Sequence, residues 1–279
     1  MRGHSNQAVI ASPSSPVILS AAKNLAYLRI NSAWQSPLVD CHVADAPRND
    51  KKGSMELAID TSTDFCSIGL SSEGEAVAEM AWHSGQKHTV ELVPNIIRLL
   101  NQAKTSPQSL SAIFVAKGPG SFNGLRVGMS TAKGLVFALD IPIIGISTLE
   151  VEAYPFAFTK LPICPLHNAG RGEIAAALYQ LKDFWRCITP EHITTADALC
   201  RQTKRKTIFC GEIPPSVIEE LQKRLARYAI IPDPAARLRH ASYLATLGWK
   251  RLDRGRLDDA ASLQPLYLRQ PPITQRKVK

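Results

Sequence analysis

Residues 117–126 read Lys-Gly-Pro-Gly-Ser-Phe-Asn-Gly-Leu-Arg, and this stretch does most to decide the fold. It follows a short apolar run and opens a longer segment of helical character. Gly118 and Gly120 allow backbone geometry that is closed to other residues, and Ser121 can cap the helix that follows. The stretch therefore predicts a strand, a tight glycine-rich turn and a helix.

The chain around this turn alternates short strands with two helices. Predicted strands cover residues 57–59, 65–70, 76–82, 112–116 and 143–146, and predicted helices cover residues 89–103 and 122–139. The first three strands follow one another with tight turns, which predicts an antiparallel meander. The strand–helix–strand order after them adds parallel strands to the same sheet. Pro94 lies inside the first helix and predicts a kink or a late start.

The second half of the sequence partly repeats this order. A helix is predicted over residues 148–158, strands over 163–166, 174–180 and 207–210, and helices over 215–228 and 237–252. We therefore expect two α/β lobes. The first covers residues 55–147, and the second, smaller lobe covers residues 148–279 and ends in a basic tail.

Residues 1–54 differ from the rest of the sequence. Ser, Pro, Asn and Ala dominate there, and no helical or strand period persists. Such composition favours disorder. Met55 is followed at once by a well-formed strand, so we expect residues 1–54 to be a disordered or mis-annotated N-terminal extension.

Composition sets broad limits on function. The chain has 279 residues, 45% hydrophobic and 20% charged, which is ordinary for a globular protein. Its net charge of +9 suits a nucleic-acid partner or an ordinary basic protein about equally. No uninterrupted apolar run reaches the roughly 18 residues of a membrane span. Six cysteines without a C-x-x-C pair predict neither a zinc site nor a disulfide framework, so we expect a cytoplasmic protein.

Two segments are candidates for phosphate binding. A glycine-rich turn that opens a helix presents free N–H groups to an anion, and an acidic residue with hydroxyls after a strand can hold a metal–nucleotide complex. The candidates are Asp60, Thr61, Ser62, Gly118, Gly120 and Ser121. The Walker pattern is missing, and a purely structural strand-to-helix turn or hairpin explains the same residues.

These segments together resemble the TsaB (YeaZ) family. The resemblance rests on residues 60–63 (DTST), residues 118–128 (GPGSFNGLRVG) and residues 132–135 (AKGL). The family hallmark is G-P-G-S-F-T-G-L-R, from which only Asn123 departs. The resemblance extends from Met55 to about Arg269 and is strongest up to Glu150.

The resemblance implies the two-lobed ASKHA fold of actin, sugar kinases and heat-shock ATPases, with mixed sheets flanked by helices. It also implies a non-catalytic partner of TsaD, the subunit that, with the ATPase TsaE, transfers threonylcarbamoyl from its adenylate to the adenosine beside the anticodon of tRNA. On this reading the chain is no enzyme alone, forms a homodimer without its partner, and has no cofactor beyond weak ATP or ADP binding at the complex interface. Direct contact with tRNA stays open.

Two positions support a non-catalytic role. The catalytic relative binds metal through His-x-x-x-His just after a strand, whereas Thr148 and Glu152 occupy the matching positions here. We therefore expect no metal. The alternative is a free-standing ASKHA ATPase or kinase. It is disfavoured because residues 167–170, His-Asn-Ala-Gly, lack a second acidic phosphate motif.

The helix after the glycine-rich turn contains several small residues. Each glycine in a helix lowers its intrinsic stability by about 1 kcal/mol relative to alanine, and close packing against another helix is the usual compensation. That helix can belong to the same chain or to another subunit. We predict that both helices of the first lobe contribute to a partner or dimer interface through Val93, Ile97, Leu100, Leu125, Gly128, Met129 and Ala132.

Overall fold

The structure is a computed structural model, and it describes residues 54–85 and 87–269. The predicted N-terminal extension, apart from Ser54, lies outside the described residues, as do the last ten residues of the predicted basic tail. Among the described residues, no helix combines the length and apolar character that crossing a bilayer requires.

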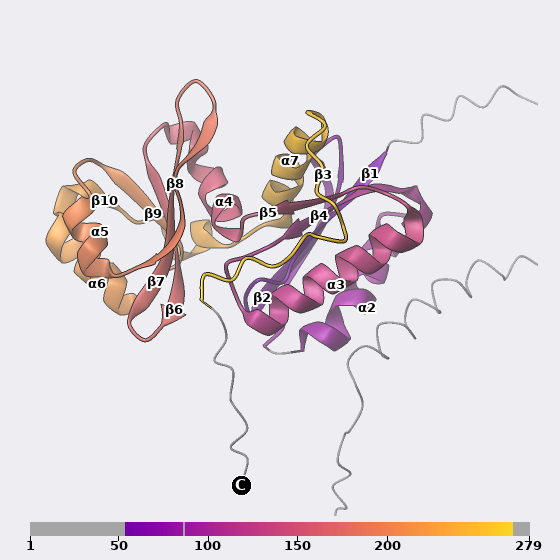
Figure 1. Ribbon diagram of the computed structural model, residues 1–279, viewed down its shortest axis with the longest axis horizontal. Helices are drawn as coiled ribbons and strands as arrows, with labels where there is room; N and C mark the ends of the chain where they lie inside the picture. Colours follow the sequence, from indigo (N-terminus) through magenta and orange to yellow (C-terminus); the bar gives the residue numbers. More distant parts are fainter. Residues whose placement is uncertain (1–53, 86, 270–279) are drawn as a thin grey trace, which may run out of the picture. The chain divides into compact units, whose positions relative to one another are not determined.

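The first lobe is a five-stranded mixed sheet with helices on both faces (Figure 1). Its strands are β1 (Met55–Asp60), β2 (Phe65–Ser72), β3 (Glu75–His83), β4 (Leu110–Ala116) and β5 (Ile143–Ile146), in the order β3-β2-β1-β4-β5. β1 pairs antiparallel with β2 and parallel with β4. The predicted antiparallel meander is confirmed, and so are the predicted parallel strands in the same sheet.

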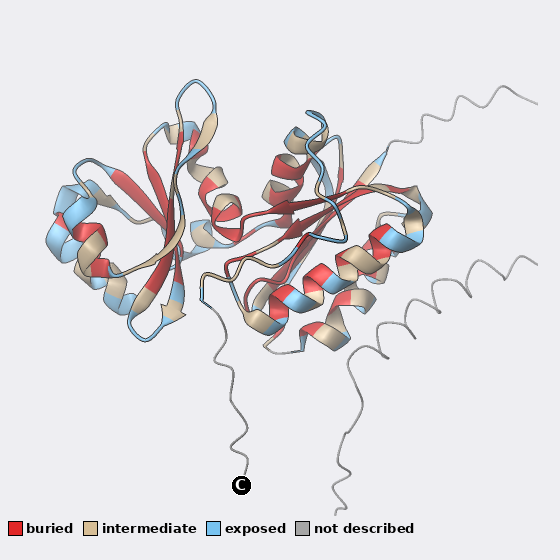
Figure 2. Cartoon of the chain, viewed as in Figure 1, coloured by how far each residue is buried: buried red, intermediate tan, exposed pale blue. Residues whose placement is uncertain are grey.

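Helices α2 (His88–Gln102) and α3 (Phe122–Leu139) pack side by side on the first sheet. Helix α7 (Ala241–Leu252) covers the other face, where Leu244 joins a core cluster with Ala58 and Phe114. Because both faces are covered, the central strands are almost wholly buried (Figure 2). The predicted second lobe included α7, whereas the structure places this helix on the first sheet.

The second lobe repeats the topology of the first. Its strands are β6 (Ile163–Gly170), β7 (Glu173–Leu181), β8 (Trp185–Thr194), β9 (Thr207–Glu212) and β10 (Ala229–Ile230), in the order β10-β9-β6-β7-β8. Helices α5 (Ala196–Gln202) and α6 (Pro215–Leu225) contribute to one core cluster of this sheet, and α4 (Thr148–Ala153) contributes to another. In both lobes a meander of three antiparallel strands continues into two parallel strands.

Several predicted boundaries differ from the structure for local reasons. Helix α2 begins at His88 and continues through Pro94, so the predicted late start is wrong. The helix predicted over residues 148–158 ends at Ala153 and continues as a 3-10 helix, Tyr154–Thr159, because Pro155 interrupts the α-helical pattern. The helix predicted over residues 237–252 begins only at Ala241. Further 3-10 helices cover Pro107–Ser109, Ala226–Tyr228 and Pro234–Arg237.

Candidate functional site

The glycine-rich turn packs directly on the hairpin between β1 and β2. The Ser121 amide donates a hydrogen bond to the Ser62 carbonyl oxygen at 2.6 Å. The Gly118 amide donates to Thr148 Oγ1 at 3.2 Å. A Cβ atom on Gly120 would lie only 2.2 Å from the Ser62 carbonyl oxygen, so this position requires glycine for close approach. The turn therefore uses its backbone to join the β1–β2 hairpin to the start of α4.

The polar groups of the β1–β2 hairpin are also used within the chain. Asp60 Oδ1 accepts hydrogen bonds from the Ser62 amide at 2.9 Å and from Ser62 Oγ at 2.5 Å. Thr61 Oγ1 donates to the Gly124 carbonyl oxygen at 2.8 Å. The structure thus brings all six predicted phosphate-binding residues together, and internal hydrogen bonds occupy several of their donors and acceptors.

A buried arginine lies at the centre of this region. Arg239 Nε is 3.0 Å from Asp60 Oδ2, and one Nη atom is 3.0 Å from Glu152 Oε1 and 3.3 Å from Glu212 Oε1. The other Nη atom donates to the Phe65 carbonyl oxygen at 3.1 Å and to Thr63 Oγ1. The Arg239 side chain is only 3% exposed. One guanidinium therefore joins the first lobe to the second.

His167 completes what we call the Arg239 centre: Arg239, Asp60, Glu152, Glu212 and His167. Its Nε2 atom is 2.7 Å from Glu152 Oε1. Burial alone would lower the pKa of Arg239, but the three carboxylates raise it above its usual range. The arginine is therefore a permanent cation.

Thr148 and Glu152, for which the sequence predicts no metal, have structural roles here. Thr148 Oγ1 accepts the hydrogen bond from the Gly118 amide, and Glu152 pairs with both Arg239 and His167. Among residues 54–85 and 87–269, no group of three or more His, Cys, Asp or Glu side chains is arranged to hold a metal ion.

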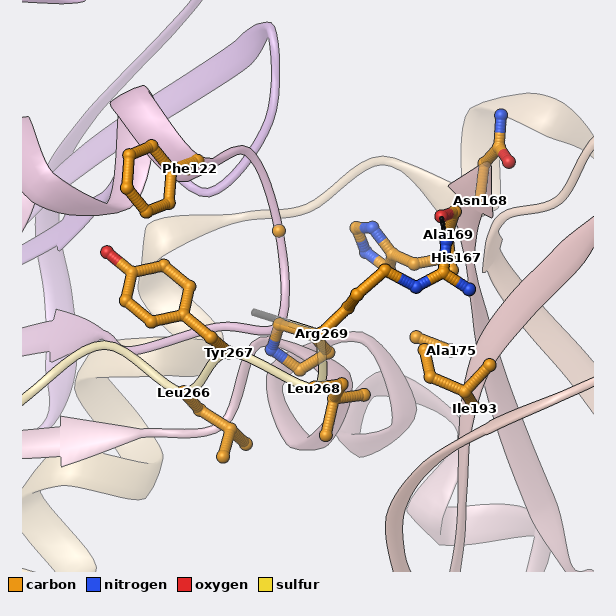
Figure 3. A pocket seen from close by; sticks show the side chains of 12 residues that line it. Phe122, His167, Asn168, Ala169, Ala175, Ile193, Leu266, Tyr267, Leu268 and Arg269 are labelled. Carbon is orange, nitrogen blue, oxygen red and sulfur yellow. Dashed lines mark hydrogen bonds between the residues drawn. The ribbon is translucent and has the colours of Figure 1, made fainter. Parts of the chain in front are cut away.

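A cavity of ≈ 320 Å³ lies beside the Arg239 centre (Figure 3). Its lining comes from the glycine-rich turn, from strands β6–β8 and from the C-terminal strap, which we define as residues 264–269. The Phe122 and Tyr267 rings lie 5.1 Å apart, and Arg269 pairs with Glu173 at the β6–β7 turn. The lining residues are Pro119, Gly120, Phe122, His167, Asn168, Ala169, Ala175, Ile193, Leu266, Tyr267, Leu268 and Arg269.

The structure separates the predicted interface residues into two groups. Val93 and Ile97 are half-buried on the outer side of α2. The others are buried within this chain, so they offer little surface to a partner: Leu100, Leu125, Gly128, Met129 and Ala132. Gly128 illustrates the reason, because a Cβ atom there would lie 2.2 Å from Thr61 Oγ1. The small residues of α3 thus pack mainly against their own lobe.

Sequence reasoning missed Arg239 and the role of His167. Both depend on contacts between distant parts of the chain, since Arg239 precedes α7 and its carboxylate partners lie at the end of β1, in α4 and in β9. The sequence did single out Glu152, as the residue in place of a metal ligand, and the structure shows that this acidic side chain is buried.

Two mixed sheets with the same strand order, joined by the contacts of the Arg239 centre, define the chain as an ASKHA-fold protein. YeaZ from Pseudomonas aeruginosa has this fold: it superposes with a TM-score of 0.66 at 26% sequence identity, over 77% of this chain and 100% of that chain.

Sequence comparisons identify the family. A family model described as "TsaD: tRNA N6-adenosine threonylcarbamoyltransferase" matches residues 82–272. The "tRNA threonylcarbamoyladenosine biosynthesis protein TsaB" of Bacillus subtilis is 34% identical over 76% of this chain and 93% of its own length. The Escherichia coli protein of the same name is 38% identical over 35% of this chain and 42% of its own length. The chain belongs to the TsaB family.

Proposed function

We propose that this chain is a non-catalytic subunit that binds and activates TsaD in the transfer of threonylcarbamoyl from its adenylate to the adenosine beside the anticodon of tRNA. In this proposal the chain acts in the cytoplasm, with TsaE as a further partner and tRNA as the substrate of the whole complex. Any ATP or ADP that it meets binds weakly at the interface with TsaD.

The Arg239 centre carries the proposal. A nucleotide with a bound metal ion would need the carboxylate of Asp60, yet that carboxylate pairs with Arg239 and accepts two hydrogen bonds from Ser62. Opening the site would leave buried charges without partners, which is strongly unfavourable. Because Asp60 and Glu152 pair with Arg239, they are not available to bind a metal–nucleotide complex. The chain is therefore better suited to supporting another subunit than to catalysis.

The outer face of α2 and α3 is the surface that we propose for the partner. Val90, Val93 and Ile97 follow one another at helical spacing on α2, and Val90 is 65% exposed. On α3, Phe137 is 92% exposed. Val90 lies in the first turn of α2 and Phe137 in the last turn of α3, so both helices expose an apolar side chain that a partner would cover. The same face would pair two copies of the chain when TsaD is absent.

The experiment is a reconstitution with the full chain, the cognate TsaD, TsaE, threonylcarbamoyl-adenylate and tRNA, from which each component is omitted in turn. We expect the chain to co-purify with TsaD, modification to stop when the chain is omitted, and the chain alone to modify nothing. Unchanged modification without the chain would overturn the proposal. Turnover of ATP by the chain alone would favour the ATPase or kinase alternative instead.

A further inference from the structure

A second cavity, of ≈ 490 Å³, has no part in the proposed function. We call it the Lys117 cavity. It shares only Leu266 with the cavity beside the Arg239 centre. Its lining residues come from both lobes and the C-terminal strap: Lys117, Ser147, Glu150, Tyr179, Trp185, Arg186, Cys187, Glu191, Arg251, Gln264, Pro265 and Leu266.

Some of the charges in this cavity have partners in the chain. Arg251 pairs with Glu150 at 2.5 Å and donates to the Gly145 carbonyl oxygen at 2.9 Å. Glu150 also accepts a hydrogen bond from Trp185 Nε1 at 3.2 Å. These contacts leave Arg251 and Glu150 with little capacity for a ligand.

Glu191 is likewise engaged, because it accepts a hydrogen bond from the Tyr179 hydroxyl at 2.9 Å. The Tyr179 ring stacks on Trp185, with centroids 5.5 Å apart and planes at 6°. Trp185 in turn meets the edge of Tyr154 at 5.4 Å. Aromatic contacts on two sides hold this wall of the cavity in place.

Three donors in the same cavity lack partners among the described residues. Ser147 is 5% exposed, and its Oγ atom lies near the Tyr179 hydroxyl and the Glu191 carboxylate but makes no hydrogen bond of normal geometry with either. The Nε atom of Arg186 is buried and makes none either. Within the described residues, neither Arg186 nor Lys117 forms an ion pair within 4 Å, although Lys117 interacts electrostatically with Glu191 across the cavity. A buried donor without an acceptor costs about 1–3 kcal/mol, so these two buried donors, Ser147 Oγ and Arg186 Nε, beside the half-buried Lys117 point to an acceptor from outside the chain.

The backbone also makes room for the lysine. A Cβ atom on Gly145 would lie 3.2 Å from Lys117 Cδ and 2.9 Å from Leu263 Cδ1. The absence of a side chain at Gly145 thus lets the Lys117 stem lie along strand β5. The cation is therefore placed by packing and is not a loose surface lysine.

We propose that the Lys117 cavity binds a small anionic metabolite, whose carboxylate or phosphate group is held by Lys117, Ser147 and Arg186. Two cations and one hydroxyl donor suit a group with several acceptor oxygens. The cavity volume suits a small molecule. This inference does not depend on the proposed function, because it involves neither the α2–α3 face nor the Arg239 centre.

The test is isothermal titration calorimetry of the full chain with two probes, inorganic phosphate and malonate, which distinguish a phosphate site from a carboxylate site. We expect saturable binding of at least one probe. Arg186→Gln and Lys117→Gln should each weaken it about tenfold or more, which equals ~1.4 kcal/mol. Ser147→Ala should weaken it less, because it removes a neutral donor.

Lys182→Gln is the matched control, since Lys182 is an exposed lysine of the same β7–β8 hairpin and does not line the cavity. Thermal unfolding of each variant establishes that it is folded. The proposal is overturned if neither probe shows saturable binding. It is also overturned if Arg186→Gln and Lys117→Gln bind as tightly as the unaltered chain, or if Lys182→Gln loses as much affinity as they do.

Discussion

The Arg239 centre and the Lys117 cavity both contain residues of the two lobes, yet their charges are arranged in opposite ways. In the Arg239 centre one guanidinium, 3% exposed, meets three carboxylates and two further oxygen acceptors. In the Lys117 cavity, Arg186 and Lys117 form no ion pair within 4 Å among the described residues, and Ser147 makes no hydrogen bond of normal geometry there.

This difference separates a structural role from a binding role. A buried charge with several opposite charges around it holds its neighbours in one arrangement, and removing one partner leaves the others uncompensated. A cation without a partner contributes little to folding and remains available to a ligand. The paired charges of the Arg239 centre therefore lie beside the segments predicted to bind phosphate. The donors that remain available to a ligand lie in the Lys117 cavity.

The largest effect is expected from Arg239→Met. This change leaves Asp60 and Glu152 buried without their cation, so we expect the free energy of unfolding to fall by about 3–5 kcal/mol. Denaturant unfolding of the full chain measures it. Arg227→Met, at an exposed arginine, is the control and should change stability by less than ~0.5 kcal/mol. Equal effects of the two variants would show that the Arg239 centre does not hold the lobes together.

A smaller decrease in stability is expected from Gly128→Ala. Alanine favours a helix over glycine by about 1 kcal/mol, so an exposed site would be stabilised. Here the added Cβ would lie 2.2 Å from Thr61 Oγ1, and overpacking of this kind costs about 1–3 kcal/mol. We expect a net decrease in the melting temperature. An increase would mean that the helix and the β1–β2 hairpin are not in firm contact.

The first lobe could be predicted well from sequence because its signals are local. The alternation of β2 and β3, the glycine-rich turn and the small residues of α3 each lie within a short window. The role of the small residues was harder to assign. The sequence shows that α3 packs closely, but only the structure shows that Thr61, in the same chain, lies against Gly128.

Neither Arg186→Gln nor Lys117→Gln should lower stability without ligand. Lys117 has no ion-pair partner in the described part of the chain, so we expect Lys117→Gln to alter the free energy of unfolding by less than ~0.5 kcal/mol. Arg186→Gln removes a buried Nε donor that lacks an acceptor, so we expect it to raise the free energy of unfolding, by at most about 1–3 kcal/mol. Urea titration in a buffer free of phosphate and carboxylates measures it. A loss comparable to that of Arg239→Met would remove the distinction between the two regions.

A further prediction concerns the pH dependence of labelling at the Cys187 thiol, since Cys187 also lines the Lys117 cavity. Burial, followed by the charges of Glu191 and Glu150, raises its pKa to about 11. Thiolate is the reactive form, so its labelling rate should keep rising until the pH reaches about 11. Labelling with a disulfide reagent in a Cys41→Ser background measures this, because Cys41 lies outside the described residues. A plateau near the ordinary thiol pKa of about 8.5 would contradict it.

The second lobe shows what sequence reasoning could not supply. Strand β8 lies at the edge of its sheet, alternates weakly and contains Pro190, so its local pattern does not favour a strand. Helix α5 has only seven residues, too few for a clear helical period. Arg239 lies in a connecting segment, and nothing in its neighbours indicates that Asp60 and Glu152 surround it.

One matched pair of substitutions tests most directly whether the chain acts as a supporting subunit through the α2–α3 face. Phe137 and Phe158 are both highly exposed, at 92% and 78%, but Phe137 belongs to α3 and Phe158 to the 3-10 helix Tyr154–Thr159. We predict that Phe137→Glu weakens co-purification with TsaD and lowers tRNA modification, while Phe158→Glu leaves both unchanged. Full binding and modification with Phe137→Glu, or an equal loss with Phe158→Glu, would contradict this assignment of the surface.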